Sequence, residues 1–136
     1  MAIRLSDYEA VVGRDVIQEL HVVADRVKGR SLQNINSTAV GGGVAEILTR
    51  MVPLLRDLGV QATWDVIKGD QAFLNVTKAF HNALHGKPEE ITDQMLGIFR
   101  DNTEMNLRDL AITGDVVLVH DPQPAGLIRR KAEIGR

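Results

Sequence analysis

Three consecutive glycines, Gly41, Gly42 and Gly43, close the stretch "NSTAVGGG" and directly precede a helical pattern. The first turn of a helix presents unpaired N–H groups and a partial positive charge, and glycine lets an anionic ligand approach the backbone closely. The stretch does not match the dinucleotide fingerprint, because Glu46 stands where the third glycine is required, and no Gly-Lys-Ser/Thr follows as in a Walker A loop. The glycines therefore predict either an anion-binding loop or a tight turn between a strand and a helix.

A second stretch, "VHDPQP", places ionisable and amide side chains directly after an apolar run. His120, Asp121 and Gln123 lie in this stretch beside two prolines that stiffen the chain. Side chains of these types at the end of a strand can hydrogen-bond sugar hydroxyls or transfer protons. In the alternative interpretation, Asp121 only caps the following turn and His120 is packed. The position of the stretch favours a functional role.

The elements that must position these residues follow from the periodicity of apolar side chains. A helix over about 6–28, capped by Ser6, is expected to precede the fold, and Pro53 is expected to kink or split the helix that begins at residue 43. The uninterrupted apolar run 116–119 is expected to be a parallel strand buried on both faces. The remaining elements are predicted as strands over 31–36 and 60–67, helices over 43–58 and 70–85, and one or two further helices over 87–110. This alternation predicts an α/β fold, Rossmann-like, with a mostly parallel sheet and flanking helices.

The predicted sheet brings the two stretches to one edge. Both follow strands, and ligands of open parallel sheets bind beyond the carboxyl ends of the strands, near the point where the strand order reverses. Ser37 and Thr38 lie in the first stretch and could offer hydroxyl groups to a ligand or cap the glycine loop.

Composition limits the classes of function. The chain has 136 residues, a formal net charge of −2, no cysteine, 44% hydrophobic and 25% charged residues. The length and composition are ordinary for one globular domain. The net charge excludes a basic nucleic-acid-binding surface. The absence of cysteine excludes a disulfide framework and a thiolate metal site, and favours a cytoplasmic location. No stretch is long and apolar enough to span a membrane. His81 and His85 are spaced for one helix face, but no third ligand accompanies them at a metal-site spacing, so no metal site is predicted.

Three long segments give the chain a family resemblance: "NINSTAVGGGVAEILTRMVPLLRDLGV", "FLNVTKAFHNALHG" and "VVLVHDPQPAGLI". In this order they resemble the N-terminal domain of the trehalose synthase family, of the glycosyltransferring type in glycosyltransferase family 4. The resemblance extends over nearly the whole chain, including "YEAVVGRDVIQEL". It implies a retaining enzyme that joins glucose from a nucleotide-diphosphate glucose to free glucose, with a GT-B architecture of two Rossmann-like domains.

The resemblance also implies roles for the two stretches. Gly41, Gly42 and Gly43 would lie near the donor phosphate and sugar, and the second stretch would lie on the acceptor side, where Asp121 would accept a hydrogen bond from a glucose hydroxyl. The acceptor residues it implies are His120, Asp121 and Gln123. The leaving phosphate itself would take the acceptor proton, so no general base is assigned. The sequence supports no Mg²⁺ or other cofactor, and the nucleotide of the donor is not determined.

Residues 1–136 are thus expected to form a single acceptor-side domain without the C-terminal nucleotide-sugar domain. Such a chain would be inactive alone and would self-associate through the apolar surface intended for the absent part. Two alternatives stay open: a fragment of a retaining trehalose phosphorylase, and a non-catalytic Rossmann-like module that binds a sugar or a partner.

Overall fold

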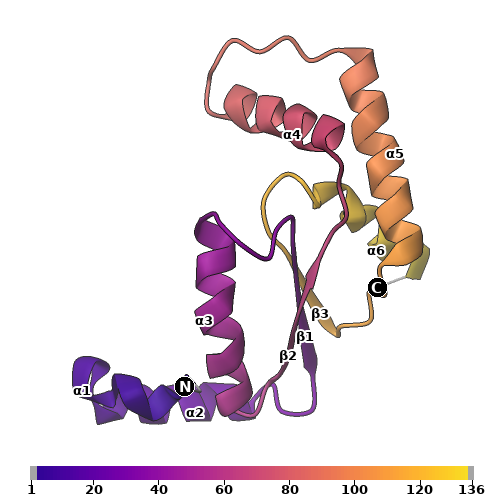
Figure 1. The fold of residues 1–136 in the computed structure, drawn as a ribbon. Coiled ribbons are helices and arrows are strands. Elements are labelled where there is room, and N and C mark those ends of the chain that lie inside the picture. Colours follow the sequence, from indigo (N-terminus) through magenta and orange to yellow (C-terminus); the bar gives the residue numbers. More distant parts are fainter. Residues whose placement is uncertain (1–2, 135–136) are drawn as a thin grey trace. The chain divides into compact units, whose positions relative to one another are not determined.

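The structure is a computed structural model, and it describes residues 3–134 of the chain. Helices alternate with strands along this part of the chain (Figure 1). The elements are η1 (Leu5–Tyr8), α1 (Glu9–Val12), α2 (Arg14–Asp25), β1 (Ser31–Asn36), α3 (Gly43–Asp57), β2 (Gln61–Val66), α4 (Gln71–Leu84), α5 (Asp93–Asp109), β3 (Val116–Val119), η2 (Ala125–Ile128) and α6 (Arg129–Ile134).

The three strands form one parallel sheet in the order β2-β1-β3, flanked by helices. This confirms the predicted α/β, Rossmann-like fold and the three predicted strands. The chain passes from β1 through α3 to β2 on one side of β1, and returns through α4 and α5 to β3 on the other side. The strand order therefore reverses between β1 and β3, which makes the carboxyl ends of these two strands the topological switch point.

The prediction that β3 is buried on both faces is wrong. Val116, Leu118 and Val119 keep 42%, 40% and 38% of their surface exposed. The reason is the position of β3 at the edge of the sheet, where no further strand of residues 3–134 pairs with it. An apolar run identifies a strand, but the number of covered faces depends on its neighbours.

Contacts divide the chain into two compact units. The first comprises the residues up to Asn34, residues 40–65 and residues 113–118. The second comprises residues 35–39, residues 66–112 and the residues from Val119 on. The carboxyl ends of all three strands consequently belong to the second unit.

The core of the first unit forms between α3 and β2. Leu48 and Val52 of α3 are buried with Ala62 of β2, and four further apolar side chains pack against them, those of Val44, Met51, Leu55 and Trp64. Helix α3 continues through Pro53 without interruption, so the predicted split is not observed. Proline removes one intrahelical hydrogen bond, and the packing of Leu48, Val52 and Leu55 of α3 in one cluster with Ala62 of β2 offsets that loss.

The N-terminal helical region of the first unit is divided. The pattern expected over 6–28 is observed as η1, α1 and α2, and Gly13, at φ +85°, separates α1 from α2. Only glycine adopts this conformation readily. The expected cap at Ser6 is not observed, because Ser6 lies inside η1 and the Asp7 carboxylate accepts the N–H of Arg4 instead.

The second unit contains the helical hairpin of α4 and α5. Asp70 caps α4 by accepting the N–H of Phe73 at 2.8 Å, and Thr92 caps α5 by accepting the N–H of Met95. Between the helices, the ring of Phe99 lies 6.1 Å from that of Phe73 and 5.5 Å from that of Phe80. These aromatic contacts give the hairpin its own small core. Among the described residues, no helix has both the length and the apolar character needed to cross a membrane.

Candidate functional site

The candidate acceptor site lies at the carboxyl ends of the strands, within the second unit. The N–H of His120 donates to the Ile35 carbonyl, and the N–H of Ile67 donates to the Asn36 carbonyl, both at 2.9 Å. These bonds extend the sheet ladder one residue beyond β3 and β2. The segments 36–39, 67–70 and 120–124 therefore leave the sheet at the same edge.

The end of β1 is shaped by a buried asparagine. Asn36 has 1% of its surface exposed, and its Nδ2 donates to the carbonyl of Thr38 at 2.7 Å. This local bond folds the chain over directly after the strand and positions Ser37 and Thr38 at the switch point. Asn36 was not singled out from the sequence, although an amide at the end of a buried strand is the kind of signal that could have identified it.

Asp121 occupies a backbone conformation that side chains rarely adopt. It is the one non-glycine residue with positive φ, at +70°, in the described part of the chain. Aspartate tolerates this region better than most residues but at an energetic cost, and such residues cluster in functional sites. Asp121 is exposed, and its carboxylate has no hydrogen-bond partner within residues 3–134. The observed turn thus leaves an aspartate at the sheet edge with its acceptor oxygens open.

Gln123 differs from Asp121 in that its hydrogen-bond acceptor is buried. Its Oε1 atom is buried and accepts no hydrogen bond from the described residues. A buried carbonyl oxygen without a donor costs about 1–3 kcal/mol, and the described residues supply no donor that would offset this cost. His120, which precedes both, donates its N–H to the sheet as described above.

Packing on α5 fixes the loop that carries these residues. Pro124 and Leu127 are buried, and a Cβ added at Gly126 would lie 2.4 Å from Oγ1 of Thr103. Only glycine allows the loop to approach α5 this closely. The end of the "HDPQPAG" stretch is thereby packed against α5.

A buried asparagine of α5 holds the segment 67–70, the third segment that leaves the sheet at this edge. Asn106 has 2% of its surface exposed; its Oδ1 accepts the N–H of Lys68 and its Nδ2 donates to the Lys68 carbonyl, both at 2.8 Å. The ammonium of Lys68 in turn pairs with the Asp109 carboxylate at 2.9 Å. Neither Lys68 nor Asn106 was predicted, because the partners lie 38 positions apart in the sequence.

We expect the Lys68→Ala substitution to raise the pKa of Asp109. The hydrogen bond from Lys68, and then its positive charge, hold the pKa of this carboxyl below its ordinary value. A lowered folded-state pKa contributes stability above the unfolded-state pKa, and this contribution is lost as the pH falls through the folded-state pKa. The titration of the Asp109 carboxyl followed by NMR should move upward in Lys68→Ala and stay unchanged in the control Lys78→Ala. Equal titration in both variants would contradict the ion pair.

The glycine loop belongs to the first unit. Gly41 and Gly42 have φ of +77° and +83°, and Gly42 is the N-cap of α3 without a side-chain hydrogen bond. The first intrahelical bond joins the N–H of Glu46 to the Gly42 carbonyl at 3.2 Å. A Cβ on Gly41, Gly42 or Gly43 would meet no atom within 4 Å. The loop therefore needs glycine for its backbone conformation at two positions, and open space lies beside all three.

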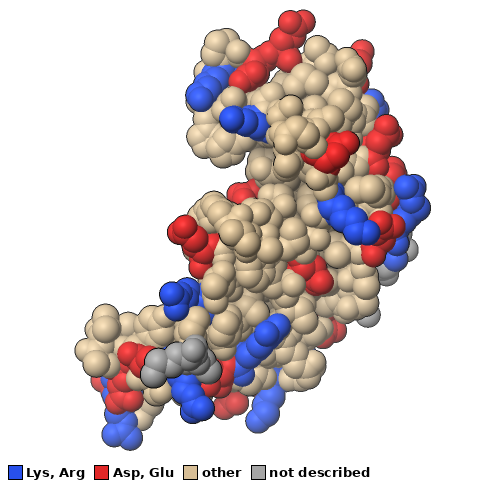
Figure 2. All heavy atoms as spheres, in the orientation of Figure 1, with Lys and Arg blue, Asp and Glu red and all other residues tan. Residues whose placement is uncertain are grey.

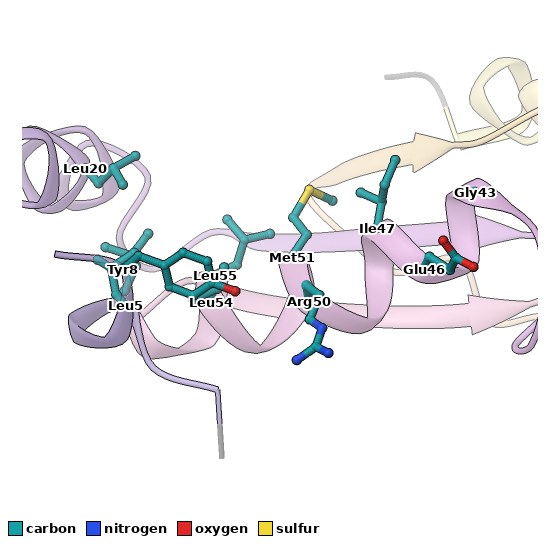
Figure 3. A pocket seen from close by; sticks show the side chains of 11 residues that line it. Leu5, Tyr8, Leu20, Gly43, Glu46, Ile47, Arg50, Met51, Leu54 and Leu55 are labelled. Carbon is teal, nitrogen blue, oxygen red and sulfur yellow. The ribbon is translucent and has the colours of Figure 1, made fainter. Parts of the chain in front are cut away.

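The first unit also contains an apolar groove of about 790 Å³. Figure 3 shows it between α3, η1 and α2, and its polar side chains are mainly Glu46 and Arg50. Apart from Gly43, it contains no residue predicted from the sequence to bind a ligand. Its apolar walls offer few partners for sugar hydroxyls, so we do not assign it to the acceptor sugar. The apolar lining side chains are those of Leu5, Tyr8, Leu20, Ile47, Met51, Leu54, Leu55 and Leu58.

Charges of both signs are mixed on the face shown in Figure 2. On the face shown in Figure 2, Lys and Arg side chains alternate with Asp and Glu and form no extended patch of one sign. Among the side chains that the structure describes, no three of His, Cys, Asp or Glu come together as metal ligands. The ring of His81, in α4, lies 4.2 Å from that of His85, the C-cap residue of the same helix.

The structure therefore brings His120, Asp121 and Gln123 together in one turn, at the sheet edge where β1 also ends. The three glycines lie in the other unit, at the start of α3.

Known proteins share these segments. A family model described as the N-terminal domain of trehalose synthase matches residues 34–135. The trehalose synthases of Thermococcus litoralis and Pyrococcus furiosus are each 46% identical over 127 residues, covering 92% of this chain and 31% of each relative. The trehalose synthase of Rubrobacter xylanophilus is 44% identical over 124 residues, covering 89% of this chain and 30% of the relative. The chain thus spans about a third of the length of these curated relatives.

Proposed function

The chain belongs to the family of trehalose synthase N-terminal domains, and from this membership we propose that it supplies the acceptor side of a retaining glucosyltransferase. In this proposal the enzyme makes trehalose from a nucleotide-diphosphate glucose and glucose. The observation that carries the proposal is the family match over residues 34–135 with 44–46% identity to trehalose synthases. A GT-B architecture and a cytoplasmic location are part of the same proposal.

The turn at 120–123 is proposed to bind the acceptor glucose. Asp121 offers unpartnered carboxylate oxygens at the switch point, and Gln123 offers a buried oxygen that lacks a donor within residues 3–134. A sugar supplies several hydroxyl donors, and hydrogen bonds to a charged acceptor are worth about 1.5–3 kcal/mol each. His120 would complete the turn on the acceptor side.

Gly41, Gly42 and Gly43 are proposed to bind the donor phosphate or the donor sugar. The uncapped start of α3 has N–H groups without intrahelical partners, and the helix dipole adds a partial positive charge. In a glycosyl transfer, negative charge grows on the leaving diphosphate, and N–H groups fixed in advance stabilise that charge.

The proposed reaction exchanges one bond at the anomeric carbon and transfers one proton. An acceptor hydroxyl oxygen bonds to the anomeric carbon of the donor glucose as the bond between that carbon and the diphosphate oxygen breaks. The diphosphate leaves with the bonding electrons and takes the proton of the acceptor hydroxyl. The protein's task is to orient the acceptor and to exclude water, which would otherwise hydrolyse the donor.

The test is an assay of the protein expressed with any sequence that its gene encodes after residue 136. We expect trehalose to form from glucose and a nucleotide-diphosphate glucose without added metal, with ADP-, UDP- and GDP-glucose assayed separately. If only inorganic phosphate drives trehalose cleavage, the protein is a phosphorylase. If glucose binds and no turnover occurs with any donor, the protein is a binding module. Either result would overturn the synthase proposal.

A further inference from the structure

Two histidines lie side by side at the end of helix α4. The ring centroids of His81 and His85 are 4.2 Å apart, and the two ring planes are inclined by 34°. Both residues are exposed to solvent. Residues at positions i and i+4 share one face of a helix, and two histidines at this spacing bind one zinc ion in the H-E-x-x-H motif. We call His81 and His85 the histidine pair.

The hydrogen bond of the His85 ring leaves its other nitrogen available to a metal ion. Nδ1 of His85 lies 2.8 Å from the carbonyl oxygen of His81. A carbonyl oxygen can only accept, so Nδ1 carries the proton and donates, and Nε2 of the neutral ring keeps its lone pair. Histidine ligands of metals are commonly oriented in this way, by donation from the second ring nitrogen to a backbone carbonyl. The His81 ring has no hydrogen-bond partner in the described part of the chain.

The backbone of the histidine pair is fixed by the way in which α4 ends, at the loop that leads to α5 (Figure 1). The N–H of His85 donates to the His81 carbonyl at 3.2 Å, so the helical spacing continues to the C-cap. The next two N–H groups, those of Gly86 and Lys87, donate to carbonyls three and five positions earlier, at 2.9 and 3.0 Å. This is the Schellman arrangement, and Gly86 has the positive φ, +80°, that it requires. Binding of one ion by the pair therefore needs rotations of side chains only.

Charges of both signs surround the end of α4. The helix C-terminus carries a partial negative charge. The Glu89 carboxylate accepts a hydrogen bond from Nδ2 of Asn82, the neighbour of His81, at 2.7 Å. The Lys87 ammonium lies 3.5 Å from Oδ1 of the same asparagine, and Lys78 is one turn before His81. Because these charges oppose one another, bonds from the imidazole nitrogens must supply most of the affinity for a cation.

We propose that the histidine pair binds one divalent transition-metal ion, with Nε2 of His85 and one ring nitrogen of His81 as the two protein ligands. Imidazole nitrogen suits Cu²⁺, Ni²⁺ and Zn²⁺, and the general order of affinity places Cu²⁺ first. Mg²⁺ and Ca²⁺ prefer oxygen ligands, so neither is expected to bind here. Water fills the remaining coordination positions, because among the described side chains no third His, Cys, Asp or Glu joins the pair.

The number of ligands limits the role of this site. Structural zinc sites have four protein ligands and catalytic zinc sites have three, so a two-ligand site belongs to neither class. Asn82 stands where the H-E-x-x-H motif has its glutamate base, so hydrolysis by a metal-bound water is not expected. The site instead suits reversible binding of an ion that links the last two turns of α4. From the sequence no metal site was expected, because spacing alone shows neither the contact of the two rings nor the Nδ1 hydrogen bond.

Isothermal titration calorimetry with Cu²⁺ tests the site, on the protein expressed with any sequence that its gene encodes after residue 136. His81→Ala and His85→Ala are each expected to weaken the binding of the same single ion by about tenfold or more, because each removes one of its two ligands. The double variant should lose no second ion. The matched control His21→Ala removes an exposed histidine from α2 and should bind Cu²⁺ like the parent protein. Circular dichroism checks that all variants are folded.

A second variant tests whether the two rings act together. Lys78→His combined with His81→Ala keeps the number of histidines but places them seven positions apart, about 10 Å along the helix. This variant is expected to bind Cu²⁺ as weakly as His81→Ala, and the electron paramagnetic resonance of the ion lost from it should show two nitrogen ligands in the parent protein. Equal binding by the parent and either alanine variant would overturn the proposal. So would full affinity in the Lys78→His/His81→Ala variant, or displacement of Cu²⁺ from the pair by an equal concentration of Mg²⁺.

Discussion

Replacing Asp121 with alanine is expected to lower the kcat/KM for glucose in trehalose formation by about 100-fold or more, because removal of a charged hydrogen-bond acceptor from an acceptor site costs about 3 kcal/mol. The physical basis is the position of this carboxylate at the switch point, with no partner for its oxygens in the described chain. The measurement is steady-state kinetics of the protein with any sequence encoded after residue 136, at varied glucose concentration.

Two further substitutions separate chemistry from backbone strain. Asp121→Gly relieves the positive φ and removes the carboxylate, so it should lose activity like the alanine variant while keeping or raising the thermal stability. The matched control is Asp101→Ala, which removes an exposed carboxylate from α5 and should leave the kinetics unchanged. Full activity in Asp121→Gly would exclude Asp121 from the site and leave it the role of a turn residue.

Replacing Gly43 with alanine is expected to raise the KM for the nucleotide sugar about tenfold or more while the fold is retained. Gly43 is the first residue of α3, and its added Cβ would meet no protein atom within 4 Å. Alanine in a helix is favoured over glycine by up to about 1 kcal/mol, so folding should be unharmed or improved. Among the described residues no atom obstructs the new methyl, so a raised KM would indicate a ligand at the helix start.

Control variants complete this test. Gly97→Ala also adds a methyl to a helix where nothing lies within 4 Å, and it should leave the KM of the donor unchanged. Gly42→Val should destabilise the chain by about 1–3 kcal/mol whether or not a ligand binds, because φ +83° and ψ +153° are accessible essentially to glycine alone. An unchanged donor KM in Gly43→Ala would reduce the glycine loop to a turn between β1 and α3.

The mistaken sequence predictions share one cause. The burial of β3 and the kink or split at Pro53, of which the split is not observed, were both inferred from residues close together in the chain. Both outcomes were decided by other elements: the strand order left β3 at an edge, and the packing of α3 on β2 maintained the helix. The role of Asn106 could not be predicted for the same reason, because it depends on a hydrogen bond with Lys68, 38 residues away in the sequence.

The sequence by itself determined the α/β class, the three strands, and the family, because apolar periodicity and long ordered motifs are local properties of the chain. It also located the two stretches that could bind a ligand. Only the tertiary structure showed that Asp121 is held at positive φ, that Gln123 buries an oxygen without a described donor, and that Gly126 packs against Thr103. Backbone strain and the hydrogen bonding of buried polar atoms depend on which residues, distant in the sequence, come into contact. The pairing of strands in the sheet and the packing of the α4–α5 hairpin decide these contacts, and the local sequence pattern does not.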